Sequence, residues 1–94
     1  MNKIIISMDQ DIQNTVTTII AAISGMKQEL IKLDFTIAGP PLKIGNPDIN
    51  YLAMALRGII KSSNSGKTLK KSELTKSGMT VGQVVKLVES KLLP

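Results

Sequence analysis

The stretch from Gly45 to Lys61, GNPDINYLAMALRGIIK, has the clearest helical pattern in this sequence of 94 residues and constrains the fold most. Asn46 is suited to the N-cap and Pro47 to the first helical position, where its missing N–H costs nothing. Asp48 then places a negative charge at the positive end of the helix dipole. Apolar residues recur along one face: Ile49, Leu52, Ala53, Leu56, Ile59 and Ile60. We therefore predict a central amphipathic helix with one face in a core.

Two flanking segments show the same periodicity. The first, residues 9–24, precedes Gly25, which is a suitable helix stop. The second begins after Thr80, which can form a capping box with Gln83. The apolar face of the first consists of Ile12, Val16, Ile19, Ile20 and Ile23, and that of the second of Val81, Val84, Val85, Val88 and Leu92. Both segments are predicted to be long helices.

The remaining segments connect these helices. Residues 26–33 are predicted to add a turn after the first helix, and residues 34–45, which include Pro40 and Pro41, to form a long connection. The connection carries its own apolar side chains, which favours packing onto the core over a free linker: Phe35, Ile37, Leu42 and Ile44.

A short helix completes the predicted fold. Residues 71–77 are expected to form one or two helical turns that end at Gly78. The β-branched content of residues 2–7 is also typical of a short strand, but the sequence offers no convincing second strand to pair with it, so residues 1–8 are expected to be a lead-in to the first helix. The fold class is then all-α, a small four-helix bundle with three longer helices and one short helix before the last, in a single domain of residues 1–94.

Composition narrows the possible functions. The chain has no Cys and no His, which removes disulfides, thiolate chemistry and the commonest general base and metal ligand. Asp9 and Asp11 suit the start of a helix better than a metal site. We therefore expect no catalytic residue, no metal and no cofactor. The apolar run of Ile4 to Ile6 is too short for a membrane span, so a cytoplasmic protein is the simplest interpretation.

The positive charge is concentrated in one segment. The chain has a formal net charge of +5. Between positions 43 and 76 there are seven basic residues and two acidic ones, a difference equal to that whole excess. Such a segment favours an acidic protein, phosphate groups or an anionic lipid surface, but it is equally typical of a solvated lysine-rich loop.

The order of these features resembles the acyl carrier protein family. The first helix and the loop after it match the family in Ile12, Val16, Ile19, Ile20, Gly25, Met26, Lys27, Gln28 and Glu29. The long connection, the central helix after a glycine, the short third helix and the TVGQVVKLVESKL helix also match, over about residues 9–93. The resemblance implies a carrier-type four-helix bundle related to the carrier proteins of fatty-acid and polyketide synthesis.

The chain departs from the family where the family does its chemistry. Carrier proteins open the central helix with Asp-Ser-Leu, and the serine holds the phosphopantetheine arm. The corresponding residues here are Pro47, Asp48 and Ile49, so Asp48 replaces that serine. The central helix of the family is also acidic, whereas this one carries Arg57 and Lys61. If the resemblance holds, partners that bind a negative helix would be repelled.

These observations favour a non-carrying protein-interaction or regulatory module, and not an enzyme. The expected contact surface is the start and exposed side of the central helix with its basic flanks: Lys43, Asp48, Tyr51, Met54, Ala55, Arg57 and Lys61. The expected partner is a protein, such as an acyl- or polyketide-processing enzyme with an acidic or apolar docking patch, and the chain itself is expected to be a monomer.

An alternative is a small basic helical protein that binds nucleic acid through residues 61–76. The scarcity of aromatic residues argues against base stacking, and the last helix has only Lys86 and Lys91 for a DNA-reading face. The run from Ser65 to Thr68, SGKT, matches the end of a phosphate-binding loop, but the first glycine of that motif would fall on Lys61 and no strand precedes it. A chance match is the better explanation of that run.

Overall fold

The computed structural model describes residues 8–92, and within them the fold is helical. Its elements are α1 (Met8–Ser24), the short 3-10 helix η1 (Gln28–Leu30), α2 (Asp48–Ser62), α3 (Lys71–Leu74) and α4 (Val81–Leu92). No strand occurs in this range; Thr36 and Thr80 form an isolated antiparallel bridge. The prediction of an all-α bundle with three longer helices and one short helix before the last is therefore confirmed at the level of its helices.

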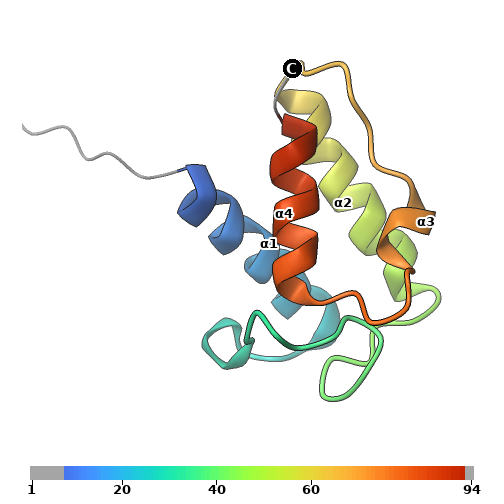
Figure 1. The fold of residues 1–94 in the computed structure, drawn as a ribbon. Coiled ribbons are helices and arrows are strands. Elements are labelled where there is room, and N and C mark those ends of the chain that lie inside the picture. Colours follow the sequence, from blue (N-terminus) through green and yellow to red (C-terminus); the bar gives the residue numbers. More distant parts are fainter. Residues whose placement is uncertain (1–7, 93–94) are drawn as a thin grey trace, which may run out of the picture.

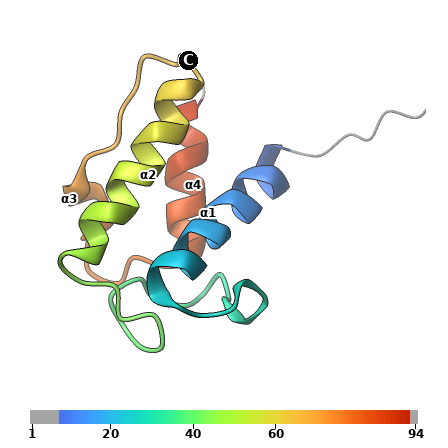
Figure 2. The ribbon, with the colours of Figure 1, turned by 180° about the vertical axis from the view of Figure 1, so that it is seen from behind.

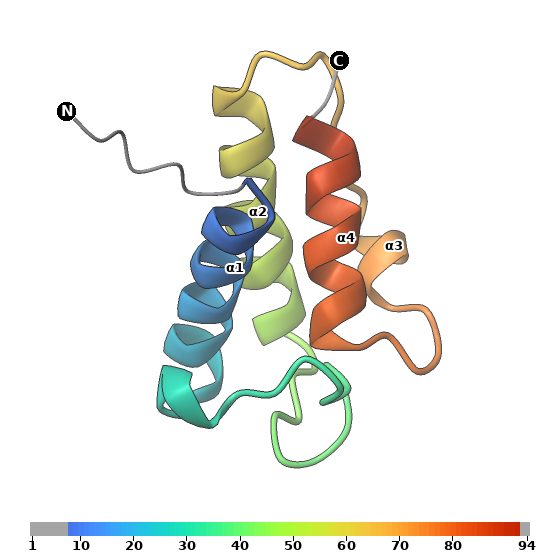
Figure 3. The same ribbon diagram turned by 60° about the vertical axis from the view of Figure 1, so that its left-hand side comes forward.

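The three long helices form the body of the fold, and α3 lies beside α2 (Figure 1). The ribbon turned by 60° shows α1 running opposite in direction to α2 and α4, which rise side by side (Figure 3). The long connection between α1 and α2 closes the end where α2 and α4 begin. From behind, residues 63–70 run back along the outside of α2 to reach α3 (Figure 2). This return path places residues 63–70 beside α2, where Arg57 of α2 is hydrogen-bonded to Leu69 O.

The core is aliphatic, as the composition predicts. Each long helix contributes its predicted apolar face, and α2 contacts α1, α3 and α4. The fully enclosed side chains come from all three long helices, the connection, α3 and the stretch before it: Val16, Ile20, Ile37, Leu52, Leu56, Ile60, Leu69, Leu74, Val81, Val84 and Val88. Each side chain of this kind contributes about 1.5–3 kcal/mol when buried. The core thus stabilises the short α3 as well as the long helices.

The start of α2 differs from the prediction. The helix begins at Asp48 with Pro47 as its N-cap, and no side chain caps it. Asn46, predicted as the N-cap, lies in the preceding turn, where its side-chain Oδ1 accepts a hydrogen bond from Lys71 Nζ at 3.0 Å. Instead of a cap, the backbone N–H of Ile49 donates to Gly45 O at 2.8 Å. The side chain of Asn46 is therefore hydrogen-bonded to Lys71, 25 positions further along the chain, and does not cap α2.

The long connection packs on the core, as predicted. Its apolar side chains Ile37, Leu42 and Ile44 are buried. Backbone hydrogen bonds tie it to the start of α4: the Ile37 N–H donates to Met79 O, and the Val81 N–H donates to Phe35 O, each at 2.8 Å. The connection is therefore part of the folded body.

A tight turn follows within the connection. The Gly39 N–H donates to Thr36 Oγ1 at 3.1 Å, and the hydroxyl of Thr36 lies where a Cβ at position 39 would be placed. The absence of a side chain at Gly39 is therefore what lets the threonine hydroxyl reach the backbone.

The ends of the other helices follow the sequence closely. Gly25 has a positive φ of 81° and its N–H donates to Ala21 O, which ends α1. The capping box of α4 is present: the Thr80 N–H donates to Gln83 Oε1 at 2.9 Å, and the Gln83 N–H to Thr80 Oγ1 at 3.1 Å. The turn predicted over residues 26–33 is the 3-10 helix η1.

Two boundaries differ from the prediction. Met8, placed in the lead-in, is the first residue of α1, and the rest of that lead-in, residues 1–7, lies outside the described residues. The helix predicted over residues 71–77 is a single turn that ends at Leu74, because the buried Leu74 is the last apolar anchor before a polar run to Gly78.

Replacing Leu56 by alanine should lower the free energy of unfolding by about 2–5 kcal/mol, because this side chain is fully enclosed and its removal leaves a cavity. Met54→Ala on the same helix is the control: Met54 is 63% exposed, so its loss should change stability by less than about 0.5 kcal/mol. Urea unfolding followed by circular dichroism measures both. Equal losses for the two variants would contradict this packing.

Candidate functional site

The exposed side of α2 carries most of the predicted contact residues. Tyr51 is 57% and Met54 63% exposed, values that are high for large apolar side chains. Arg57 and Lys61 are also exposed one and two turns further on. These four residues follow one another at helical spacing, so the structure brings them together as a single stripe.

The other predicted contact residues contribute less. Asp48, at the first position of α2, and Ala55 are half-buried, and neither lines the two hollows at the ends of α2 that are described below. Lys43 is exposed but lies in the connection before α2, with a positive φ of 49°. Of the predicted surface, the exposed residues that lie next to one another are thus those of the stripe on α2: Tyr51, Met54, Arg57 and Lys61.

A basic hollow lies at the carboxyl end of the stripe. It has a volume of about 530 Å3 and is lined by Arg57, Lys61, Asn64, Gly66, Lys67 and Thr68. Three of these residues are cations and none is an acid. The sequence has no Asp or Glu from position 49 to position 72, so this side of α2 has no carboxylate of its own to neutralise the cations.

Hydrogen bonds fix the backbone around this hollow. The Arg57 Nε donates to the backbone oxygen of Leu69 at 2.6 Å, which holds residues 63–70 against α2. At the other side, Ser65 Oγ donates to Lys91 O at 2.6 Å and Lys67 Nζ to Ser90 O at 3.3 Å. Two of the cations, Arg57 and Lys61, therefore lie on α2 itself, and the third, Lys67, lies on a loop that is hydrogen-bonded to both α2 and α4.

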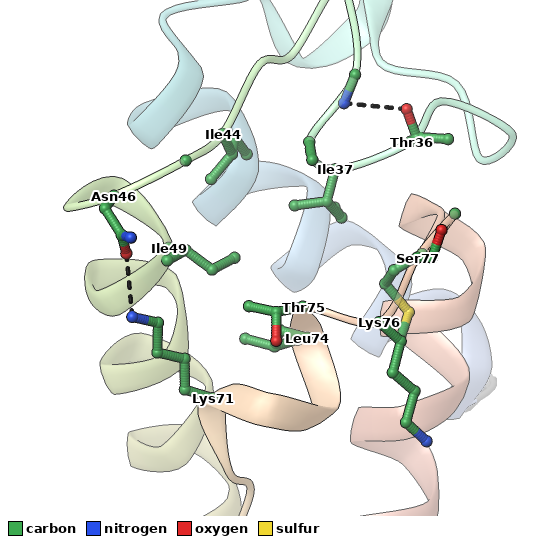
Figure 4. Close-up of a pocket in the computed structure, with 15 residues that line it drawn as sticks. Thr36, Ile37, Ile44, Asn46, Ile49, Lys71, Leu74, Thr75, Lys76 and Ser77 are labelled. Atoms are coloured by element: carbon green, nitrogen blue, oxygen red, sulfur yellow. Dashed lines mark hydrogen bonds between the residues drawn. The ribbon is translucent and has the colours of Figure 1, made fainter.

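A second hollow, of about 630 Å3, lies at the opposite end of α2. Figure 4 shows Ile37, Ile44, Ile49 and Leu74 pointing toward one another between the connection, the first turn of α2 and α3. All four are 4% exposed or less, so they form an apolar floor.

The rim of this apolar hollow is polar. Lys71 reaches across to Asn46, whereas Lys76 points away from the apolar floor (Figure 4). The lining residues also include three that carry a hydroxyl group: Thr36, Thr75 and Ser77. This arrangement suits a small apolar group. It holds no carboxylate that could act as an acid or base.

Prediction from the sequence missed the apolar hollow. Its lining comes from residues 36–39, 44–46, 49, 71 and 74–79, which only the fold brings together. The one signal in the sequence was the group of apolar residues in the long connection. It predicted that the connection packs on the core, but it did not indicate a hollow beside that core.

Glu73 on α3 links the basic segment to α4. Its Oε1 accepts a hydrogen bond from the Lys70 N–H at 2.9 Å, and its Oε2 lies 3.1 Å from Lys91 Nζ. The Lys70 N–H is the largest cause of a lowered pKa for Glu73; partial desolvation opposes it, and the charges of Lys91 and Lys76 add to it. One of the two acids in the basic segment is thus occupied in holding α3 to α4.

Within residues 8–92, no group of three or more acidic residues is placed to hold a metal ion. The helices of the same range include none with the length and apolar character needed to cross a membrane.

Comparison of the chain with protein-family models, curated proteins and solved structures gives no match.

The ion pair of Glu73 should make stability depend on pH. A lowered pKa in the folded state means that the ionised form stabilises the fold at neutral pH, and that this contribution is lost as the pH falls through the folded-state pKa. Glu73→Gln keeps an oxygen for the Lys70 N–H but removes the charge. The urea midpoint of the wild-type protein should exceed that of Glu73→Gln at pH 7. The gap should begin to shrink near the ordinary pKa of a glutamate, about 4.3, and close once the pH falls below the lowered folded-state pKa. A gap that persists in acid would contradict this role of the carboxylate.

Proposed function

We propose that this protein is a carrier-protein-like helical bundle that has lost the prosthetic-group site and acts as a non-carrying protein-interaction or regulatory module. The observation that carries the proposal is the position of Asp48: it is the first residue of α2, the helix that in the resemblance to acyl carrier proteins opens with the phosphopantetheine-bearing serine. A carboxylate does not form the stable phosphodiester that a serine hydroxyl forms.

The helix order supports this proposal. Three long helices, a long packed connection after the first and a single-turn helix before the last occur in the order that the resemblance requires. The serines downstream of Asp48 do not offer a substitute, because Ser62, at the last position of α2, lies about 20 Å from Asp48 along the helix.

The surface chemistry supports a binding role. Tyr51 and Met54 leave apolar area in solvent on a helix whose opposite face is fully used in the core. An exposed apolar pair beside cations is typical of contact surfaces. The partner that suits it is a protein with an apolar and acidic docking patch, such as an enzyme that processes acyl or polyketide groups.

A phosphopantetheinyl transferase of broad specificity tests the loss of the carrier site. Incubated with this enzyme and coenzyme A, the wild-type protein should show no gain in mass, and Asp48→Ser should gain one phosphopantetheine. Asp48→Ala, which also removes the carboxylate but supplies no hydroxyl, should gain none. Mass spectrometry of the intact protein measures all three, and a gain on the wild-type chain would overturn the proposal.

A second candidate function is nucleic-acid binding by residues 61–76. It is favoured by the acid-free run around the basic hollow, which offers phosphate groups several cations on one side of the molecule. Binding of this kind releases counterions, so its affinity should fall steeply with salt.

A gel-shift series separates this candidate from the first. We expect a shift of duplex DNA or single-stranded RNA at low salt at most, and none at about 150 mM salt, because the cations are few and base-stacking aromatic residues are scarce. A sequence-dependent shift that survives at the higher salt would favour nucleic-acid binding over protein interaction.

A further inference from the structure

We propose that the exposed stripe of α2 binds an acidic amphipathic helix of a partner protein, with the apolar side chains of that helix on Tyr51 and Met54 and its carboxylates in the basic hollow. This inference rests on the proposed interaction function and specifies the chemistry of the partner. The charges are also opposite to those that the resemblance implies: carrier proteins present an acidic helix to their partners, whereas here the helix would be basic and the partner acidic.

The apolar end of the surface is formed by Tyr51 and Met54. They are three residues apart, so they are neighbours on the helix surface and expose one continuous area. Methionine adapts its shape to different apolar partners, and tyrosine adds a rigid ring at small entropic cost.

The basic end is formed by Arg57, Lys61 and Lys67. Arg57 and Lys67 are each fixed by a hydrogen bond to a backbone oxygen, from Leu69 and Ser90 respectively. Lys61 lies between them on the last turn of α2 and lines the same hollow. Carboxylates that enter this hollow meet three cations and no competing acid on the walls.

The spacing of the two ends defines the partner segment. From Met54 to Lys61 is seven residues, about 10 Å along the axis of α2. A helical partner that lies along the stripe would carry its apolar and acidic side chains about the same distance apart, on one face, at intervals of three and four residues.

The combination of features favours a peptide over other anions. A phosphate backbone would use the cations but leave Tyr51 and Met54 without apolar contacts. An anionic membrane would offer headgroup phosphates to the cations, but its charged groups lie in a layer above its apolar region, whereas the stripe places apolar and cationic side chains one after the other along a single helix. An acidic amphipathic helix satisfies both ends at once.

Selection from a library of displayed peptides tests this inference and requires no identified partner. Randomised 16-residue peptides would be selected on the wild-type protein at about 150 mM salt, which screens weak surface charge. We expect the recovered peptides to combine apolar residues at helical spacing with at least two acidic residues about seven positions away.

Variants then locate the binding surface. Lys61→Glu and Met54→Ala should each weaken a recovered peptide by about tenfold or more, because one places like charges together and the other removes apolar contact. Lys32→Glu is the matched control: this exposed lysine lies in the connection between η1 and α2, and its reversal should change the affinity less than twofold. Circular dichroism checks that every variant is folded.

Three results would overturn the inference: no enriched peptide, enriched peptides without acidic residues, or peptides insensitive to Lys61→Glu. Sedimentation with vesicles of phosphatidylcholine and phosphatidylglycerol at 7:3 is a further arm. Binding to these vesicles that is lost in Lys61→Glu would assign the stripe to a membrane surface instead. The transferase assay does not depend on these outcomes, so failure of the peptide selection leaves the loss of the carrier site to be judged separately.

Discussion

Burial of one face of α2 is the constraint on which the rest of the structure depends. This helix packs against α1, α3 and α4, and its buried residues run from Ile49 in the first turn to Ile60 in the last. Because the core is aliphatic, stability comes from many small contacts between interlocking side chains, without large rings to fill space. On the opposite face of α2, Tyr51 and Met54 are exposed and take no part in this core, whereas Arg57 contributes to the fold through its hydrogen bond to Leu69 O.

The two hollows differ because their surroundings differ. At the amino end of α2, the packed connection and α3 bring apolar side chains such as Ile37 and Leu74 together, and polar groups occupy only the rim. At the carboxyl end, residues 63–70 bridge α2 to α4 through polar contacts, and cations line the space between them. A single helix therefore presents apolar and cationic environments at its two ends.

Much of the fold could be predicted from the sequence because its long helices have regular apolar faces. The capping box of Thr80 with Gln83 and the stop at Gly25 were predictable for the same reason: each is formed by residues close together in the chain. One wrong prediction was that of Asn46 as an N-cap. Its side chain is hydrogen-bonded to Lys71, and no local pattern indicates a partner that the fold brings in from another element.

The candidate site, too, was predictable only where it depends on residues close together in the chain. The exposed positions of Tyr51 and Met54 were predictable, since they fall outside the apolar stripe of α2. The hollow formed with Lys67 was not, because the sequence does not reveal that a hydrogen bond ties the returning loop to α2.

The turn at Gly39 has a consequence for how this chain can diverge. A larger residue at position 39 would displace the hydroxyl of Thr36, so the threonine would have to rotate away and the backbone N–H would lose its acceptor, at about 1 kcal/mol. Substitutions at the two positions are therefore coupled. In homologous chains we expect a threonine or serine at 36 to accompany glycine at 39, and a bulkier residue at 39 to accompany loss of the hydroxyl.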